Sequence, residues 1–388
     1  MSRGGRFKTT GSVGACSVKR ESDMAAGRAE TSRGNGRRVS AVAAVVMSAI
    51  LSTQAMAEPT TPLVSKSVRL DHGLYDGVYS LDQQQLFVAG GGSKGDKDGG
   101  RIFRLDPKTL ATLDTVRTPR QVFGLAVDQK QHRLYATGSR DGSLTILDDR
   151  SGKILTTLVL ADPDQPVPKG EKKHAEPRHV VIDQSTGRAY ITGVANDGKV
   201  WVVDTTTLEQ MPAIEHIGKR PTGLVLDEAH HRLYVTLMGD NAIAVIDLDQ
   251  ESVVETWPTT VEGPIDIEMD HKRQRLLVTS TQAGALEVMD ADNGHSLGRY
   301  PTGDGALGVA LDSDNDHVYV ANRNAGTVTV LDGEDYRTIA SLPTGTHPNT
   351  ITIDPASHHV FVTNKAARIG KQDDPDDEHG NTVTLITP

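Results

Sequence analysis

The side chains best suited to chemistry in this sequence are cations that flank short apolar runs. Arg120, Arg178, Arg220 and His347 precede such runs, Arg323 and Lys365 follow them, and Asn349 stands beside His347. An Arg guanidinium presents a planar fork of donors that suits phosphate or carboxylate. We therefore predict that these seven residues bind an anion. The alternative is that each Arg bonds a loop carbonyl or a neighbouring carboxylate.

An enzyme is the second interpretation of the same residues. His347 could act as a general base at neutral pH, with Glu176 near it and Arg220 on an ester or carboxylate. That chemistry would make the protein a lactonase or a lyase acting on a small anionic substrate. No nucleophile or metal constellation accompanies these residues, so we favour a binding module over an enzyme.

Metal and cofactor signals are weak. An acidic segment with oxygen ligands for a hard cation contains Asp373, Asp374, Asp376, Asp377, Glu378 and His379. It lacks the ligand spacing of a calcium loop, and His174 with His179 is a poor metal pair. The segment GGGSKGDKDGG at 90–100 lacks the GK[ST] ending of a phosphate-binding loop. We predict no metal and no cofactor.

These candidate residues are positioned by an internal repeat. An Asp ends an apolar run in seven units, at Asp82, Asp128, Asp183, Asp227, Asp270, Asp312 and Asp354. A second Asp follows in six units, at Asp106, Asp148, Asp204, Asp247, Asp290 and Asp332. Repeats of about 40–45 residues with only short β-type runs are typical of propeller blades. The sequence predicts an all-β, seven-bladed propeller whose repeated Asp residues cap turns by bonding nearby backbone.

One unit shows the four expected strands, TGLVLD, HRLYVT, NAIAVIDL and SVVETWP, between 222 and 258. The seventh unit ends at Pro388 before a fourth strand. The segment PLVSKSVRL at 62–70 precedes the first unit and alternates as a strand would. We predict that it pairs in the last blade and closes the ring, which removes an exposed sheet edge.

The first 57 residues have the pattern of an export signal. Arg37 and Arg38 precede an apolar run, Val39 to Leu51, and small residues at Ala55 and Ala57 follow it. We expect a signal peptide in 1–57 with cleavage near Ala57, a translation start at Met24, and one domain in 58–388. The run is too short for a membrane span. The remaining chain has 32 basic and 48 acidic residues, a charge near −16, and no cysteine.

The repeat units resemble YVTN-type propeller repeats, as in HVYVANRNAGTVTVLD at 317–332. GGRIFRLDPKTL (99–110), EPRHVVIDQSTGRAYITG (176–193), GKRPTGLVLD (218–227) and THPNTITID (346–354) are similar to the periplasmic YncE-like proteins of Gram-negative bacteria. The resemblance implies a periplasmic seven-bladed propeller without demonstrated catalytic activity. It also implies a link to single-stranded DNA, which the negative charge of this chain opposes.

Blade geometry predicts where a ligand or partner would meet the protein. The long segments at 90–100, 161–177 and 366–381 should emerge on the same face as the cations, and long loops on a rigid scaffold commonly carry function. We expect a monomer that recognises an anionic ligand there, or a protein partner through 161–177 and 366–381. For stacked nucleotide bases, Tyr75 and Phe123 are the best-placed aromatic side chains.

Overall fold

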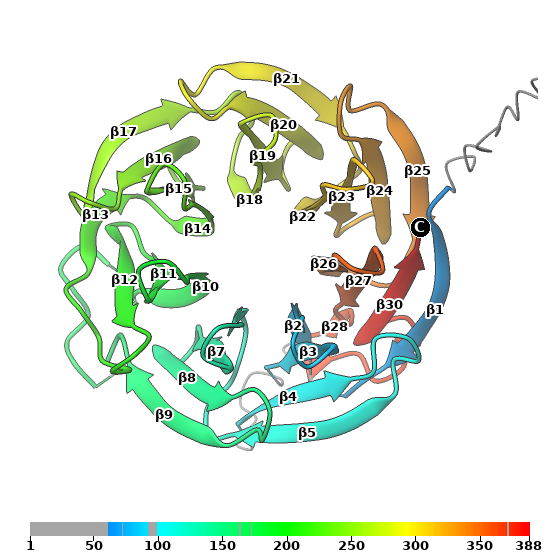
Figure 1. Ribbon diagram of the computed structural model, residues 1–388, viewed down its shortest axis with the longest axis horizontal. Coiled ribbons are helices and arrows are strands. Elements are labelled where there is room, and N and C mark those ends of the chain that lie inside the picture. Colours follow the sequence, from blue (N-terminus) through cyan, green and yellow to red (C-terminus); the bar gives the residue numbers. More distant parts are fainter. Residues whose placement is uncertain (1–60, 72, 92–98, 163, 172, 371) are drawn as a thin grey trace, which may run out of the picture. The chain divides into compact units, whose positions relative to one another are not determined.

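A computed structural model describes residues 61–388 except 72, 92–98, 163, 172 and 371. These residues belong to one compact unit, Ala57–Pro388. They form seven four-stranded antiparallel sheets arranged as blades around a central axis (Figure 1). The predicted all-β, seven-bladed architecture is confirmed. The expected signal peptide at 1–57 lies outside the described residues.

Each blade runs from an inner strand on the axis to an outer strand on the rim. Blades one to three contain β2 (Leu74–Ser80), β3 (Gln85–Gly90), β4 (Gly100–Leu105), β5 (Thr112–Thr118); β6 (Leu125–Asp128), β7 (Arg133–Gly138), β8 (Ser143–Asp148), β9 (Ile154–Val159); and β10 (Glu176–Asp183), β11 (Arg188–Val194), β12 (Gly198–Asp204), β13 (Ile214–Gly218). Blades four and five contain β14 (Pro221–Asp227), β15 (Arg232–Leu237), β16 (Ala242–Asp247), β17 (Ser252–Pro258); and β18 (Pro264–Asp270), β19 (Arg275–Ser280), β20 (Ala285–Asp290), β21 (Ser296–Pro301).

The last two blades complete the circle. They contain β22 (Ala306–Asp312), β23 (His317–Asn322), β24 (Thr327–Asp332), β25 (Thr338–Pro343); and β26 (Pro348–Asp354), β27 (His359–Asn364), β30 (Thr382–Thr387), β1 (Leu63–Arg69). The segment between β27 and β30 holds a two-stranded ribbon, β28 (Arg368–Ile369) and β29 (Gln372–Asp373). In the described part of the chain, no helix is both long and apolar enough to cross a membrane.

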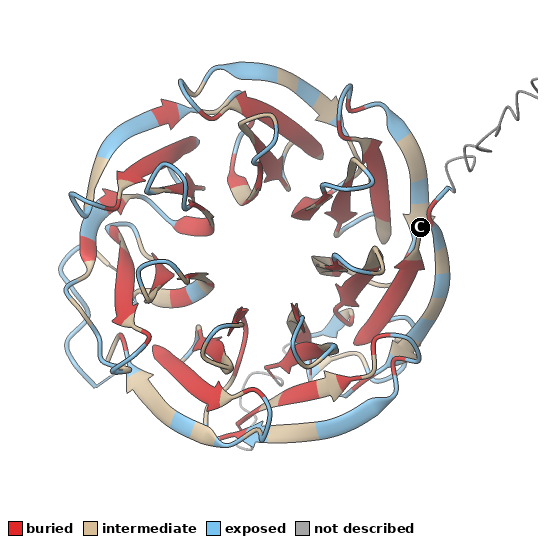
Figure 2. Ribbon diagram, viewed as in Figure 1, coloured by how far each residue is buried: buried red, intermediate tan, exposed pale blue. Residues whose placement is uncertain are grey.

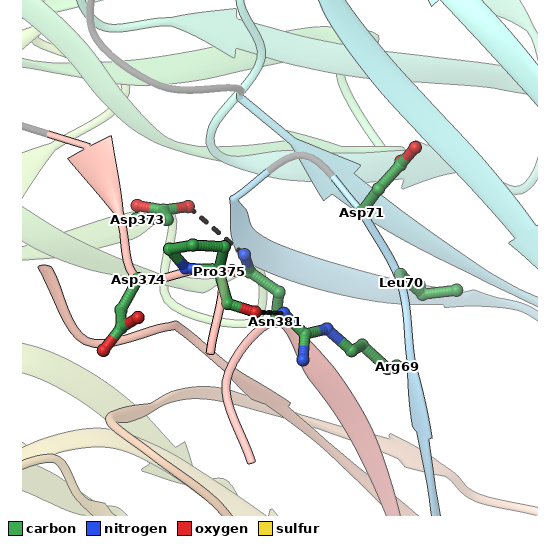
Figure 3. A pocket seen from close by; sticks show the side chains of 7 residues that line it. All are labelled: Arg69, Leu70, Asp71, Asp373, Asp374, Pro375 and Asn381. Carbon is green, nitrogen blue, oxygen red and sulfur yellow. Dashed lines mark hydrogen bonds between the residues drawn. The ribbon is translucent and has the colours of Figure 1, made fainter. Parts of the chain in front are cut away.

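The ring is closed by β1, the first strand of the chain, which pairs antiparallel with β30 near its end. Val68 and Leu70 pack into the core between blades seven and one. Arg69 Nη2 donates a hydrogen bond to the carbonyl of Pro375 at 3.1 Å, so the segment after β29 also holds the closing strand (Figure 3). The predicted closure by 62–70 is therefore confirmed.

The repeated Asp residues cap turns as predicted. Asp183 Oδ1 accepts the backbone N–H groups of Ser185 and Thr186, and Asp204 Oδ1 accepts those of Thr206 and Thr207. The alignment was wrong in the first unit, because Asp82 lies beyond β2. Ser80 ends that strand and pairs with Gln85, as Asp128 pairs with Arg133 in the second blade. A Ser hydroxyl can accept the same local bonds, and the amide of Gln83 donates to Ser80 Oγ.

The core lies between neighbouring blades. Tyr135 and Ile146 of blade two pack with Val180 and Trp201 of blade three. Figure 2 shows that the middle strands are buried, whereas outer strands such as β5 and β21 expose many residues. Because each sheet is covered on both faces, the inner strands are held at fixed positions around the axis.

Candidate functional site

A cavity of about 1340 Å³ follows the central channel. Side chains at equivalent places on the seven inner strands line much of it, and they form rings. Each place is defined by the number of residues by which it precedes the last residue of its inner strand. The upper ring, five residues back, is Tyr75, Phe123, Arg178, Thr222, Ile265, Leu307 and Asn349. The middle ring, four back, is Asp76, Gly124, His179, Gly223, Asp266, Gly308 and Thr350. The lower ring, two back, contains Glu268 among Val78, Ala126, Val181, Val225, Ala310 and Thr352.

Five of the seven predicted anion-binding residues line this cavity. They are Arg178, Arg220, Arg323, Asn349 and Lys365. Arg323 Nη1 donates to Asn349 Oδ1 at 2.7 Å, which joins the end of β23 to β26 in the next blade. The fold therefore gathers residues from blades three, four, six and seven that are far apart in the sequence.

The other two predicted residues do not line the cavity. Arg120 donates to the carbonyl of Asp141 at 3.1 Å and lies 3.8 Å from the Asp141 carboxylate. His347 Nδ1 lies 3.4 Å from the Ala366 carbonyl. For Arg120 and His347 the structure therefore shows the alternative to anion binding, in which the side chain contacts a loop carbonyl. Of the three residues in the enzyme interpretation, Glu176 and Arg220 line the cavity and His347 does not.

Arg220 and His347 occupy a strained backbone position. Each directly precedes an inner strand and has a positive φ, 54° and 46°. The equivalent places in blades one, five and six hold Gly73, Gly263 and Gly305, also at positive φ. Glycine adopts this left-handed region without a Cβ penalty, whereas other residues pay of order 1 kcal/mol or more. Strained non-glycine residues concentrate at functional sites, and of these two Arg220 reaches the cavity.

Lys365 is the most enclosed of the cavity cations. It is 6% exposed, and its Nζ lies 3.2 Å from the centroid of the Tyr75 ring. Burial, with the nearby charges of Arg323 and Arg368, lowers the pKa of Lys365 to about 6. Burial likewise lowers the pKa of Arg178 and of Arg323. Lys365 and Arg323 are therefore poorly solvated, and a negative charge between them would relieve that cost, whereas Arg178 keeps an exposed surface in the channel.

A fifth cation, Arg140, lines the same cavity and was missed from the sequence. Its guanidinium lies 5.4 Å from the centre of the Phe123 ring, and Phe123 contacts Tyr75 edge to face at 4.2 Å. One face of each aromatic ring is thus covered by a cation, and the rings touch each other. This arrangement leaves little aromatic surface on which a nucleotide base could stack.

Five of the six Lys and Arg side chains that line the cavity have no carboxylate of the described residues within 4 Å, namely Arg140, Arg178, Arg220, Arg323 and Lys365. The sixth, Lys173, pairs with Glu176 at 2.6 Å. Other cations of the chain are paired, as Arg188 is with Glu251 at 2.7 Å and Arg273 with Asp316 at 2.6 Å. In a chain with ten more acidic than basic residues, the cavity thus gathers several unpaired cations in one place.

Five acidic side chains line the cavity, and sequence reasoning missed three of them, Asp76, Asp266 and Glu268, which lie on inner strands. Burial raises the pKa of Asp76 and of Asp266, and it raises the pKa of Glu268 to about 7. His179 Nδ1 lies 3.7 Å from Asp266 Oδ1. The sequence did contain a signal for two of these residues, because Asp76 and Asp266 occupy the place in the repeat where three other units have Gly.

The long segments contribute differently to the site. Glu171 and Lys173 of 161–177 line the cavity, and Glu171 accepts hydrogen bonds from Asn196 and Asp197 of blade three. In the acidic segment, Asp377 accepts bonds from Ala367, Thr346 and His379, while Asp373 faces Asn381 (Figure 3). Among the described residues no group of three or more His, Cys, Asp or Glu is arranged to hold a metal ion.

Comparison with known proteins identifies similar chains. A family model described as "YNCE-like beta-propeller" matches residues 195–374. The chain is 30% identical over 252 residues to "Uncharacterized protein YncE" of Escherichia coli (strain K12), which covers 64% of this chain and 69% of that protein. It is 29% identical over 259 residues to the protein of the same name in Escherichia coli O157:H7, covering 66% of this chain and 70% of that one. A protein of that name in Salmonella typhi is 29% identical over 231 residues, or 58% of this chain and 64% of the relative.

Proposed function

The chain belongs to the family of YncE-like beta-propellers, and from this premise we propose that it is a binding module whose cavity holds a small anionic ligand. The observation that carries the proposal is the set of five cavity cations with no carboxylate within ion-pair distance among the described residues. Lys365 is buried and Arg323 half-buried, and leaving such cations without partners costs free energy that a bound anion would offset. Arg178, Arg220 and Arg323 can each offer two parallel donors to a carboxylate or phosphate.

A small anion fits this site better than a nucleic acid. The cavity is enclosed by seven blades, and the rings of Tyr75 and Phe123 are covered as described above. The net charge of −10 for the whole chain opposes a long polyanion more strongly than a ligand with one or two charges. Short-range donors inside a channel act on a small ligand despite that long-range repulsion.

The proposal is tested by calorimetric titration of the purified protein with citrate and with pyrophosphate at low ionic strength. Arg178→Gln and Arg323→Gln should each weaken binding roughly tenfold, because each removes a charge-assisted hydrogen bond. Arg117→Gln is the matched control, since Arg117 is exposed on β5 outside the cavity. If Arg117→Gln weakens binding as much as Arg178→Gln does, the attraction is non-specific and the proposed site is wrong.

Nucleic acid is tested separately by anisotropy of a labelled single-stranded oligonucleotide at low and physiological salt. We expect no binding that depends on Arg178. Salt-sensitive binding lost in Arg178→Gln and kept in Arg117→Gln would instead make the cavity mouth a nucleic-acid site. If the protein binds neither a small anion nor the oligonucleotide, a protein partner that contacts 161–177 and 366–381 becomes the next candidate.

A second candidate function is the lactonase or lyase, and His179 now favours it more than His347. His179 lines the cavity beside Arg178 and lies 3.7 Å from Asp266, which would orient and charge-stabilise an imidazole acting as general base. Hydrolysis of a lactone by the protein, abolished in His179→Gln without unfolding, would establish an enzyme. Inactivity of the wild-type protein on a panel of lactones and esters would exclude this activity.

The proposed location is the periplasm, on the signal-like pattern of 1–57. We expect osmotic shock to release the protein from expressing cells. Mass spectrometry should then detect processing near Ala57. Retention in the spheroplast fraction at full length would contradict it.

A further inference from the structure

The middle and lower rings of the cavity hold three carboxyl groups, Asp76, Asp266 and Glu268, for which the described residues supply few cationic partners. Asp76 accepts hydrogen bonds from the amides of Gly77 and Leu125, but neither Asp76 nor Glu268 has a cationic side chain within 4 Å among the described residues. Among the described residues, Glu268 Oε1 accepts a hydrogen bond from the amide of Met269. His179 Nδ1 lies 3.7 Å from Asp266 Oδ1, and this imidazole is not within 4 Å of Asp76 or Glu268.

The opposite charges of this cavity are separated along the strands. Arg178 lies in the upper ring, Asp76 and Asp266 in the middle ring, and Glu268 in the lower ring. A strand rises about 3.3 Å per residue, so the upper and lower rings are roughly 7–10 Å apart, allowing for the bulge in each inner strand. Lys365 and Arg323 lie at the ends of β27 and β23, on the upper side.

These charges do not cancel one another inside the protein. Arg178 is influenced electrostatically by Asp266, Glu176 and Asp76, yet none of these carboxylates comes within 4 Å of it. Three places of the middle ring are glycine, where the inner strand of the next blade approaches closely. At Gly223, for example, a Cβ atom would lie only 2.9 Å from Asp266 Oδ1.

We propose that the cavity selects a small zwitterion, with its carboxylate among Arg178, Arg323 and Lys365 and its ammonium group between Asp266 and Glu268. This inference rests on the proposed anion site and adds a second site, which binds the positively charged group of the ligand. Amino acids with a terminal amine and short peptides have the required chemistry, because a flexible chain separates their two charges. An ammonium group offers three donors, which matches carboxylates that have unused acceptor capacity.

The test uses three probes that share a hydrocarbon chain. These are 6-aminohexanoate, which carries both charges, hexanoate, which carries only the anion, and hexylamine, which carries only the cation. Each is titrated calorimetrically into the wild-type protein, Glu268→Gln and Arg178→Gln at pH 8. Glu228→Gln is the control for Glu268→Gln, since Glu228 is exposed on the turn after β14.

We expect 6-aminohexanoate to bind roughly tenfold more tightly than either single-charge probe, because it gains a second charge-assisted contact. Glu268→Gln should abolish that advantage while leaving hexanoate binding unchanged, which also shows that the variant is folded. Arg178→Gln should weaken both 6-aminohexanoate and hexanoate. Glu228→Gln should behave as wild type.

Equal binding of 6-aminohexanoate and hexanoate, with both weakened by Arg178→Gln, would overturn the zwitterion inference and leave the anion site intact. Hexylamine binding as tightly as 6-aminohexanoate, with hexanoate silent, would overturn both the inference and the anion site. Binding of none of the three probes, together with no binding of citrate or pyrophosphate, would likewise overturn both.

Discussion

Lys365 Nζ lies 3.2 Å from the centroid of the Tyr75 ring, so a cation at the end of blade seven rests on the inner strand of blade one. The ring favours the ammonium form by about 0.5–2 kcal/mol. Burial and the neighbouring Arg charges act in the opposite direction and lower the pKa of Lys365 from 10.5 to about 6, equivalent to roughly 6 kcal/mol. Because burial and the Arg charges outweigh the attraction to the ring, the pKa of the Lys365 amine lies below its ordinary value.

Lys365→Met is therefore expected to stabilise the protein. The unfolded chain binds a proton at this site up to pH of about 10.4, whereas the folded protein releases it at lower pH. Lys365 thus costs folding free energy near neutral pH, and the cost shrinks as the pH rises toward 10. We expect Lys365→Met to raise the free energy of unfolding by about 1–3 kcal/mol at pH 7, with weaker citrate binding. Denaturant titrations at pH 7 and pH 9.5 measure this, and a destabilised variant at pH 7 would contradict it.

Removing the closing strand should destabilise the ring. A chain that begins at Asp71 lacks β1 with Val68, and Leu70 directly after it, and exposes the edge of β30. The lost apolar burial corresponds to roughly 3–6 kcal/mol. We expect a sharp fall in melting temperature relative to a chain that begins at residue 61, which keeps the strand. Equal melting temperatures would mean that β1 contributes nothing to closure.

Asp183 should make stability depend on acid pH. Its carboxylate accepts two amides and two hydroxyls from Ser185 and Thr186. Burial raises the pKa of Asp183, but these hydrogen bonds outweigh burial and lower it. The stabilisation is therefore present above a pH of about 3.9 and is lost as the pH falls through the lower folded-state pKa. Asp183→Ala should cost about 2 kcal/mol at pH 7.

Asp183→Asn is the matched variant for that measurement. It keeps an oxygen acceptor but cannot titrate, so its loss at pH 7 should be smaller and the acid-dependent part should disappear. Urea titrations between pH 3 and pH 7 compare the three proteins. An acid dependence of stability identical in wild type and Asp183→Asn would show that another group is responsible.

Gly223→Ala should disturb the middle ring. An added Cβ would lie 2.8 Å from Asp266 Cα and 2.9 Å from its Oδ1, contacts that require the inner strand of blade five to shift. We expect a loss of about 1–3 kcal/mol. Gly77→Ala is the control, because the nearest atom to its added Cβ is Thr352 Oγ1 at 3.3 Å. A larger loss for Gly77→Ala than for Gly223→Ala would refute the close-approach argument.

Arg220→Gly separates stability from binding. Glycine relieves the left-handed strain at φ 54°, and its greater freedom in the unfolded chain offsets that gain. The free energy of unfolding should stay within about 1 kcal/mol of wild type, while citrate binding weakens roughly tenfold. Thermal melts and titrations of the same preparation report both quantities. Unchanged citrate binding would remove Arg220 from the site.

Sequence periodicity was sufficient for the architecture because each repeat encodes the same local interactions. Three features can be recognised within one repeat or between neighbouring repeats: the apolar runs, the turn-capping Asp residues and the unpaired strand at 62–70. The single misalignment, Asp82 in place of Ser80, arose because a hydroxyl performs the capping that a carboxylate performs elsewhere. The anion-site prediction drew on the same repetition, which placed Arg178 and Arg220 near the starts of inner strands and Arg323 just after a second strand.

Only the tertiary structure decided which of those side chains share a cavity. His347 occupies the position equivalent to Arg220, but a local carbonyl lies beside its side chain, and Arg120 likewise donates to a loop carbonyl outside the cavity. Asp266 and Glu268 look like ordinary alternating strand residues until the ring closes, which makes both line the cavity and brings Asp266 to His179. The physical reason is that a repeat pattern specifies contacts along the chain, whereas charge pairing across the channel depends on residues brought together from different blades.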